Sequence, residues 1–181
     1  MSDSEERPGG RLPLLGRADL VPEQKTLWNK VDATVGAWAG KVGCKSKAAD
    51  HRFIGPFNPM LRSPDTALTF LQLQTDEAKN TSLSERVRQV VILSMGSVWR
   101  FSYELYAPRG CCSPRGPSGG VLSGARALAL TAEHAVDDDR YAEALRRFGE
   151  KGLVDFAVVV GCYQLVCSLL NLFAIPTPNP A

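Results

Sequence analysis

Residues 82–107, SLSERVRQVVILSMGSVWRFSYELYA, carry the strongest fold signal in this chain of 181 residues. Ser82 is followed three residues later by Glu85, which is the spacing of a capping box at the start of a helix. Apolar residues then recur at helical spacing, so the pattern predicts one long helix over about 83–107. The stripe expected to be buried consists of Val87, Val90, Val91, Ser94, Val98, Phe101 and Leu105.

The sequence before this helix predicts a loose arm and then further helices. Residues 1–21 are polar and rich in Pro and Gly, and we expect them to lie on the domain as an arm. A helix should begin at Pro22, and one short helix is expected near 59–62 within a loop. Asp65 should cap another helix that reaches about Lys79. Its inward residues should be Leu68, Phe70, Leu71 and Leu73.

The sequence after this helix predicts two more helices. Asp137 should cap a short helix that ends at Gly149 or Gly152, and a last helix should cover about 153–174. No segment keeps the alternation of a strand, so we expect an all-α domain over 22–178. The inward residues of the short helix should be Tyr141, Ala144, Leu145 and Phe148.

The last predicted helix is apolar enough to raise the question of a membrane span. Asp155, Gln164 and Asn171 interrupt it, and such side chains are costly in lipid. A helix that is apolar nearly all round is also typical of a bundle core or an oligomer interface. We favour this second interpretation and expect no membrane partner.

Composition and charge exclude several classes of protein. With 44% apolar residues the chain should fold, and 21 Lys and Arg against 19 Asp and Glu give no reason to expect a nucleic-acid partner. There is no glycine-rich phosphate loop and no cluster at metal-ligand spacing, so neither a cofactor nor a metal is expected.

The five cysteines predict free thiols. They show no CxxC spacing and no pairing with histidine at zinc-finger distance. The first twenty residues lack a long apolar run, so no secretory signal is expected and the predicted location is cytoplasmic. The five are Cys44, Cys111, Cys112, Cys162 and Cys167.

Three quoted segments together resemble a known family. Residues 84–107, preceded by IGPFNPMLRSPD at 54–65 and followed by GLVDFAVVVGCYQLVCSLLNLFAIPTP at 152–178, resemble the carboxymuconolactone decarboxylase-like family of the alkylhydroperoxidase D-like fold. The likeness covers most of 12–178. It implies a bundle of several helices that assembles with copies of itself into a homotrimer or hexamer, and a small-molecule substrate.

The peroxidase branch of that family uses two thiols at i and i+3 on one helix, one to attack peroxide and one to resolve it as a disulfide. Aligned with this pattern, the thiol positions fall on Phe101 and Glu104. The upstream glutamate falls on Gln89 and the histidine on Pro108. The resemblance therefore argues against peroxidase activity by this mechanism.

The other branch works without thiols and carries the motif WxxxYExYAH. The resemblance implies that Glu104 is the catalytic acid or base of a lyase or isomerase. Its substrate would be a small cyclic or unsaturated carboxylic acid or lactone. Aromatic neighbours would raise the pKa of Glu104 by desolvation, and some of them would shape the pocket. The motif positions hold Trp99, Tyr103, Glu104, Tyr106, Ala107 and Pro108.

Each candidate site residue also has a structural interpretation. Glu104 could simply be neutralised by Arg100 or Arg88, and we weigh this equally with catalysis. His51 and Asn58 belong to the loop that matches the family's GPFN turn and are candidates for the pocket lining. A loop histidine is more often solvated, and a buried asparagine more often holds backbone groups.

Residues 108–120, PRGCCSPRGPSGG, depart from the family, which continues a helix here. Two explanations remain open: a shifted reading frame or exon boundary, and a genuine loop that replaces a helix pair. Three functional classes therefore remain. They are an acid/base enzyme using Glu104, a non-catalytic oligomeric scaffold favoured by Gln89 and Pro108, and an unusual redox protein using Cys111, Cys112 or Cys162.

Overall fold

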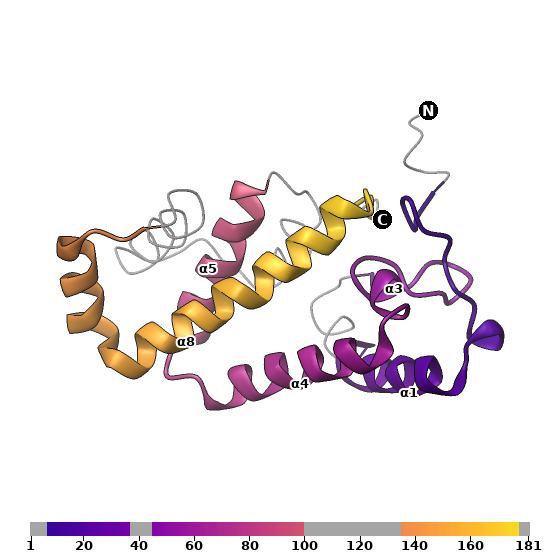
Figure 1. Ribbon diagram of the computed structural model, residues 1–181, viewed down its shortest axis with the longest axis horizontal. Coiled ribbons are helices and arrows are strands. Elements are labelled where there is room, and N and C mark those ends of the chain that lie inside the picture. The colour runs from indigo at the N-terminus through magenta and orange to yellow at the C-terminus, as the bar shows by residue number, and fades with distance from the viewer. Residues whose placement is uncertain (1–6, 37–44, 100–134, 178–181) are drawn as a thin grey trace. The chain divides into compact units, whose positions relative to one another are not determined.

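The computed structural model describes residues 7–36, 45–99 and 135–177, and these parts of the chain are helical (Figure 1). Within them no strand forms, and the β-type pairing is limited to one isolated bridge between Lys47 and Phe53. The all-α prediction is confirmed. The chain divides into two compact units, which we describe separately. Unit 1 comprises 1–72 with 168–181, and unit 2 comprises 73–167.

Unit 1 begins with short helices, and its first main helix starts where the sequence predicts. Pro22 occupies the first helical position, where its missing N–H costs nothing. Val21 has no capping side chain, and the Gln24 side chain instead accepts the Val21 N–H at 3.1 Å. The predicted short helix exists but begins at Phe57. The elements of unit 1 are η1 (Arg17–Asp19), α1 (Pro22–Val31), η2 (Asp32–Gly36), α3 (Phe57–Met60) and the first part of α4 (Pro64–Asn80).

The described part of the N-terminal arm is fixed in unit 1 rather than loose. The Arg11 backbone N–H donates to the Phe173 carbonyl at 2.7 Å, and its guanidinium donates to the Leu172 carbonyl at 2.8 Å. Carbonyls at the end of a helix lack helical partners, so these bonds satisfy groups that would otherwise need water. Gly10 allows this approach: it has φ of 63°, and a Cβ there would lie 2.2 Å from the Phe173 oxygen.

Two predicted helix caps prove to be wrong by one or two residues. Asp65 lies inside the first turn of α4, because Pro64 already begins that helix. In unit 2, α5 runs Glu85–Val98 and its N-cap is Ser84, whose extended backbone suits a cap and whose Oγ accepts the Val87 N–H at 3.4 Å. Ser82 therefore does not cap α5.

Ser82 instead contacts a residue that is distant in sequence, Asp155. Its backbone N–H and its hydroxyl donate to the Asp155 carboxylate at 2.7 and 2.8 Å, and Lys151 donates to the same oxygen at 2.7 Å. Burial raises the pKa of the Asp155 carboxyl, but these donors outweigh it and lower that pKa to about 2. This contact ties the turn before α5 to α8.

Helix α8 (Asp138–Leu172) is two helical segments joined at a corner, visible as the sharp bend in orange in Figure 1. Asp137 caps the first segment as predicted, since its Oδ1 accepts the Arg140 N–H at 2.8 Å. Of the two predicted break points, Gly149 forms the corner, with φ of 65° and ψ of 176°. A side chain there would be strained although the space around it is open.

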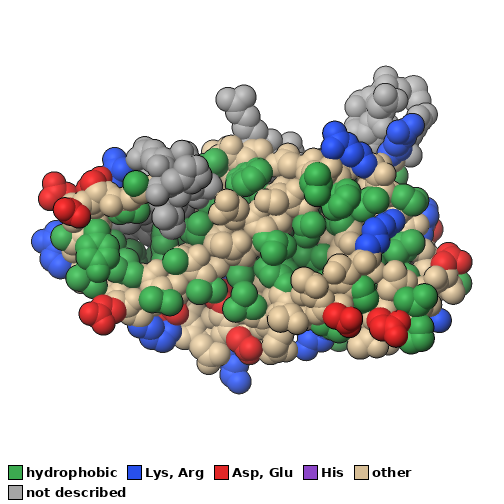
Figure 2. Space-filling view, in the orientation of Figure 1, with side chains coloured by type: hydrophobic (Ala, Val, Ile, Leu, Met, Phe, Trp, Pro, Cys, Tyr) green, Lys and Arg blue, Asp and Glu red, His purple; other side chains and the backbone are tan. Residues whose placement is uncertain are grey.

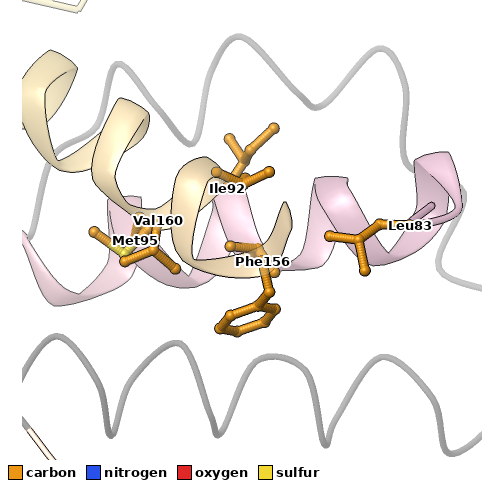
Figure 3. Close-up of a cluster of buried hydrophobic side chains, with 7 residues drawn as sticks. Leu83, Ile92, Met95, Phe156 and Val160 are labelled. Carbon is orange, nitrogen blue, oxygen red and sulfur yellow. The ribbon is translucent and has the colours of Figure 1, made fainter. Parts of the chain in front are cut away.

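The core of unit 2 is built mainly by α5 and the second segment of α8 (Figure 3). The buried stripe of α5 is rotated from the predicted one. Ile92 and Met95 are buried, whereas Val90 and Ser94 are only half-buried. The predictions that Leu73 and Tyr141 face inward are wrong, because both are exposed. The buried cluster contains Leu83, Val91, Ile92, Met95, Phe156, Val159 and Val160.

Among the described helices, α8 passes the length and composition test for a membrane span, with a mean hydropathy of 2.0 and 39% of the tested window buried. Hydrophobic side chains are visible along it in Figure 2. Val154 and Leu165 are among its exposed apolar residues. This test is also passed by core helices of soluble proteins.

Candidate functional site

The structure describes three of the six predicted site residues. His51 and Asn58 belong to unit 1, and Trp99 belongs to unit 2. The catalytic candidate Glu104 and its neighbours Tyr103 and Tyr106 lie outside the described residues. So do segment 108–120 and three of the cysteines, Cys44, Cys111 and Cys112.

Asn58 is fully buried, and its side chain bonds to the N-terminal arm and to Arg62. Its Oδ1 accepts the Leu15 backbone N–H at 3.3 Å, and its Nδ2 donates to the Pro13 carbonyl at 3.3 Å. Oδ1 also accepts from the Arg62 guanidinium at 3.3 Å. These bonds hold the N-terminal arm against α3, which is the structural role that a buried asparagine commonly has.

Two arginines complete this attachment of the arm. Arg62 donates to the Pro13 carbonyl at 2.6 Å and to the Asn58 carbonyl at 2.9 Å. Arg52 donates to the Leu14 carbonyl at 3.2 Å. Burial lowers the pKa of the Arg62 guanidinium, and the three oxygens to which it donates are neutral. The arm and the loop before α4 are therefore one hydrogen-bonded assembly.

His51 is exposed on a tight turn in unit 1. Its backbone has φ of 65°, and its N–H donates to the Ala48 carbonyl at 3.0 Å. A left-handed backbone is uncommon for a non-glycine residue and is tolerated by histidine better than by bulky residues. The exposure matches the solvated interpretation of this side chain.

Trp99 ends α5 and lies against the core of unit 2. Its backbone N–H donates to the Met95 carbonyl at 3.1 Å, and its side chain packs against the buried cluster of α5 and α8. The indole Nε1 is buried and has no hydrogen-bond partner among the described residues. A buried donor without an acceptor is rare in folded proteins.

A buried ion pair that the sequence did not predict joins α4 and α5. The Arg88 Nε and Nη2 donate to the two oxygens of Glu77 at 3.0 and 2.5 Å, and Nη1 donates to Glu85 at 2.9 Å. The Glu77 and Arg88 side chains are only 6% and 11% exposed. Burial disfavours the Arg88 cation, but the bonds and charge of Glu77 outweigh it and raise the pKa of the guanidinium.

One sequence signal could have revealed Glu77. It follows Phe70 by seven residues, which is two helical turns, so it lies on the same face of α4 as that buried ring. A charged side chain placed on a buried face needs a buried partner. The partner, Arg88, lies eleven residues further along on another helix, so its identity could not be obtained from periodicity.

The two described cysteines are buried in α8. Burial raises the pKa of the Cys162 thiol, the Glu77 charge acts in the same direction, and Arg88 opposes them. Cys167 is fully buried. Reactive cysteines are partly exposed and have lowered pKa values, so Cys162 has the features of a structural thiol. Across the described ranges no three His, Cys, Asp or Glu side chains are grouped so that they could hold a metal ion.

Comparison with solved structures defines the fold class. The chain is similar to a protein from Ralstonia eutropha JMP134, described as an alkylhydroperoxidase AhpD core and an uncharacterized peroxidase-related protein. The TM-score is 0.63 at 15% sequence identity, over 95% of this chain and 94% of that one.

The chain therefore has the helical fold of an AhpD core, as the sequence resemblance implied. At this identity the likeness shows the fold alone. No family model matches the chain, and neither does any curated protein. The narrower kinship with carboxymuconolactone decarboxylases stays a prediction.

Proposed function

We propose that this protein is a cysteine-independent acid/base enzyme, a lyase or isomerase acting on a small cyclic or unsaturated carboxylic acid or lactone. Glu104 is its acid or base. The resemblance of residues 84–107 to carboxymuconolactone decarboxylase-like proteins and the AhpD-core fold support this proposal.

The observation that carries the proposal is the pairing of Arg88. A structural Glu104 was expected to be neutralised by Arg88 or by Arg100. Each of the three Arg88 nitrogens already donates to a carboxylate oxygen of Glu77 or Glu85. Three of the five Arg88 N–H groups are thus bonded to Glu77 and Glu85, and this supports a role for Glu104 other than neutralising Arg88.

The chemistry requires one group that both removes and returns a proton. Decarboxylation or isomerisation of an unsaturated acid moves a proton at the carbon next to a carbonyl or enol. Pro108 stands where the resemblance expects a histidine, so a single carboxyl must serve in both directions. A carboxyl with a raised pKa is suited to this because both of its protonation states are accessible near neutral pH.

Glu104→Gln tests the proposal directly. The variant should retain binding of a five-membered unsaturated lactone that carries a carboxylate, while its turnover falls by about 100- to 10,000-fold. Glu150→Gln is the matched control, because Glu150 is an exposed carboxylate on α8 and should leave turnover unchanged. Equal turnover by wild type and Glu104→Gln contradicts the proposal, and binding without any turnover by the wild type favours the scaffold.

A peroxidase is the second candidate, because the structural neighbour is described as peroxidase-related and the fold is equally consistent with it. Cys162 is buried with a raised thiol pKa, so peroxide reduction would depend on the cysteines outside the described residues. A variant with all five cysteines replaced by serine or alanine separates the two. Loss of thiol-dependent peroxide consumption in that variant would establish the peroxidase, and unchanged lactone turnover would establish the acid/base enzyme.

A further inference from the structure

Asn58 contacts the N-terminal arm in the way that proteins contact a bound peptide. Its amide donates to the Pro13 carbonyl and accepts the Leu15 N–H, both at 3.3 Å. These two backbone groups are two residues apart, and residues 13–16 form neither a helix nor a turn. An amide side chain can make both bonds because it carries a donor and an acceptor. Main-chain hydrogen bonds of this kind give affinity for an extended segment whatever its side chains are.

Two arginines add further donors to the arm backbone. Arg62 donates to the Pro13 carbonyl at 2.6 Å, and Arg52 donates to the Leu14 carbonyl at 3.2 Å. We call the side chains of Arg52, Asn58 and Arg62 the arm-binding row. A buried polar group that loses its partner is costly, so this row is more stable with an occupant than without one.

The contacts at the other end of the arm depend on its sequence as well as its backbone. The Arg11 N–H donates to the Phe173 carbonyl at 2.7 Å, and the Arg11 guanidinium donates to the Leu172 carbonyl at 2.8 Å. A cation is favoured at the carboxyl end of a helix such as α8. Gly10 has φ of 63°, and a Cβ there would collide with the carbonyls of Phe173 and Ala174. The end of α8 therefore selects a glycine followed by an arginine.

The arm is attached mainly through polar contacts. Among the side chains of residues 7–15, Leu14 is buried, Leu12 and Leu15 are half-buried, and the arginines and prolines are exposed. Segments with few buried apolar contacts open locally while the rest of the protein stays folded. We therefore expect the arm to detach and return without unfolding the helices of unit 1.

We propose that the arm-binding row and the end of α8 form a peptide-binding site, which the arm occupies within its own chain and which the arm of a second copy occupies when the first detaches. The second arm is the occupant because its sequence supplies every group that these contacts use, from Gly10 to Leu15. All the residues named lie in unit 1. None of the contacts involves Glu104, so the proposal does not depend on the proposed function.

A titration of the full-length protein with a fluorescent peptide of residues 7–17, RPGGRLPLLGR, tests the site. The arm competes with the peptide, so the apparent Kd equals the intrinsic Kd divided by the fraction of molecules with the arm detached. Gly10→Val in the protein strains its own arm, because valine does not tolerate this φ. That variant should bind the peptide about 10- to 100-fold more tightly than wild type.

Three controls accompany this titration. Adding Asn58→Ala to Gly10→Val removes the amide from the row and should weaken peptide binding by about tenfold or more. A peptide with valine in place of its second glycine should bind more weakly by a similar factor. Glu23→Gln changes an exposed carboxylate on α1 and should bind as wild type does.

Mixing two variants tests the exchange between copies. Asn58→Ala keeps the arm but damages the row, whereas Gly10→Val damages the arm but keeps the row. Labelled with donor and acceptor fluorophores, the two should associate about tenfold more tightly than Asn58→Ala does with the double variant, which lacks both parts. An excess of the unlabelled peptide should reverse this association.

Each outcome either supports or overturns a part of the proposal. No peptide binding by Gly10→Val, or equal binding of the two peptides, overturns the site. Equal affinity of wild type and Gly10→Val overturns the competition by the arm. Peptide binding without association of the mixed variants overturns the second copy as the occupant. Should Gly10→Val not fold, the wild-type titration with the two peptides decides.

Discussion

The two units bury polar side chains in different ways: unit 1 buries the neutral amide of Asn58, and unit 2 buries the ion pair of Glu77 and Arg88. Asn58 is neutral and bonds to backbone groups of the arm at Pro13 and Leu15. Glu77 and Arg88 are charged and bond to each other between two helices. The comparison teaches that a neutral amide can fix a loop at modest cost, whereas charges can be buried only as a matched pair.

Removing one charge of the pair should have the largest effect. Glu77→Gln leaves the buried Arg88 cation with only the exposed Glu85 as an acidic partner, and a guanidinium cannot escape burial by giving up its proton. The free energy of unfolding should fall by about 3–5 kcal/mol, measured by urea denaturation. Glu85→Gln, which alters a side chain that is 68% exposed, should change it by about 1 kcal/mol or less.

A second variant sharpens this result. Glu77→Gln combined with Arg88→Met removes both charges and should recover much of the lost stability, because apolar replacement of a complete pair is often nearly neutral. A double variant as unstable as Glu77→Gln alone would show that the loss comes from packing rather than from the uncompensated cation.

Asn58→Ala should have the next largest effect. It leaves the partly buried Leu15 N–H without its acceptor, although Arg62 still donates to the Pro13 carbonyl. The expected loss is about 1–3 kcal/mol in thermal or urea unfolding, together with faster proteolysis of the arm. Asn29→Ala alters an asparagine whose hydrogen bond to Arg17 is exposed and serves as the control. Unchanged proteolysis of the arm in Asn58→Ala would contradict the role given to this residue.

Replacing Asp155 should have the smallest effect on stability, and that effect should depend on pH. Its folded pKa of about 2 lies below the usual value of about 3.9, so it contributes stability that is complete above about pH 4 and is lost as the pH falls through 2. Asp155→Asn should therefore lower stability slightly at pH 7 and flatten its decline between about pH 4 and pH 2. Parallel acid profiles for the two proteins would contradict this assignment.

Much of the fold could be predicted from local signals in the sequence. Pro22 and Gly149 act through their own backbone conformations, and Asp137 acts through a hydrogen bond to the N–H three residues on. Such signals are local, so the sequence located the helix starts at Pro22 and Asp137 and gave Gly149 as one of two candidate break points. Ser82 misled the prediction because Ser84, two residues later, also offers a capping hydroxyl and has the extended backbone a cap needs. Periodicity predicted that α5 has a buried face, but only tertiary packing selects Ile92 over its apolar neighbours.

The candidate site could be predicted less well. Its polar contacts join residues that are distant in sequence, such as Ser82 with Asp155 and Asn58 with Leu15. No local pattern encodes such pairs. The unpartnered indole of Trp99 likewise depends on what surrounds it in three dimensions, and not on the motif to which it belongs.

The two buried thiols of α8 can report how often that helix opens. Cys162 and Cys167 can react with an alkylating reagent only when the helix opens and exposes them. Under conditions where closing is faster than alkylation, the labelling rate gives the free energy of that opening, in the same way as amide hydrogen exchange. Ligands that bind the closed form should slow the labelling. Mass spectrometry of the C-terminal peptide could thus detect a binding partner before any reaction is known.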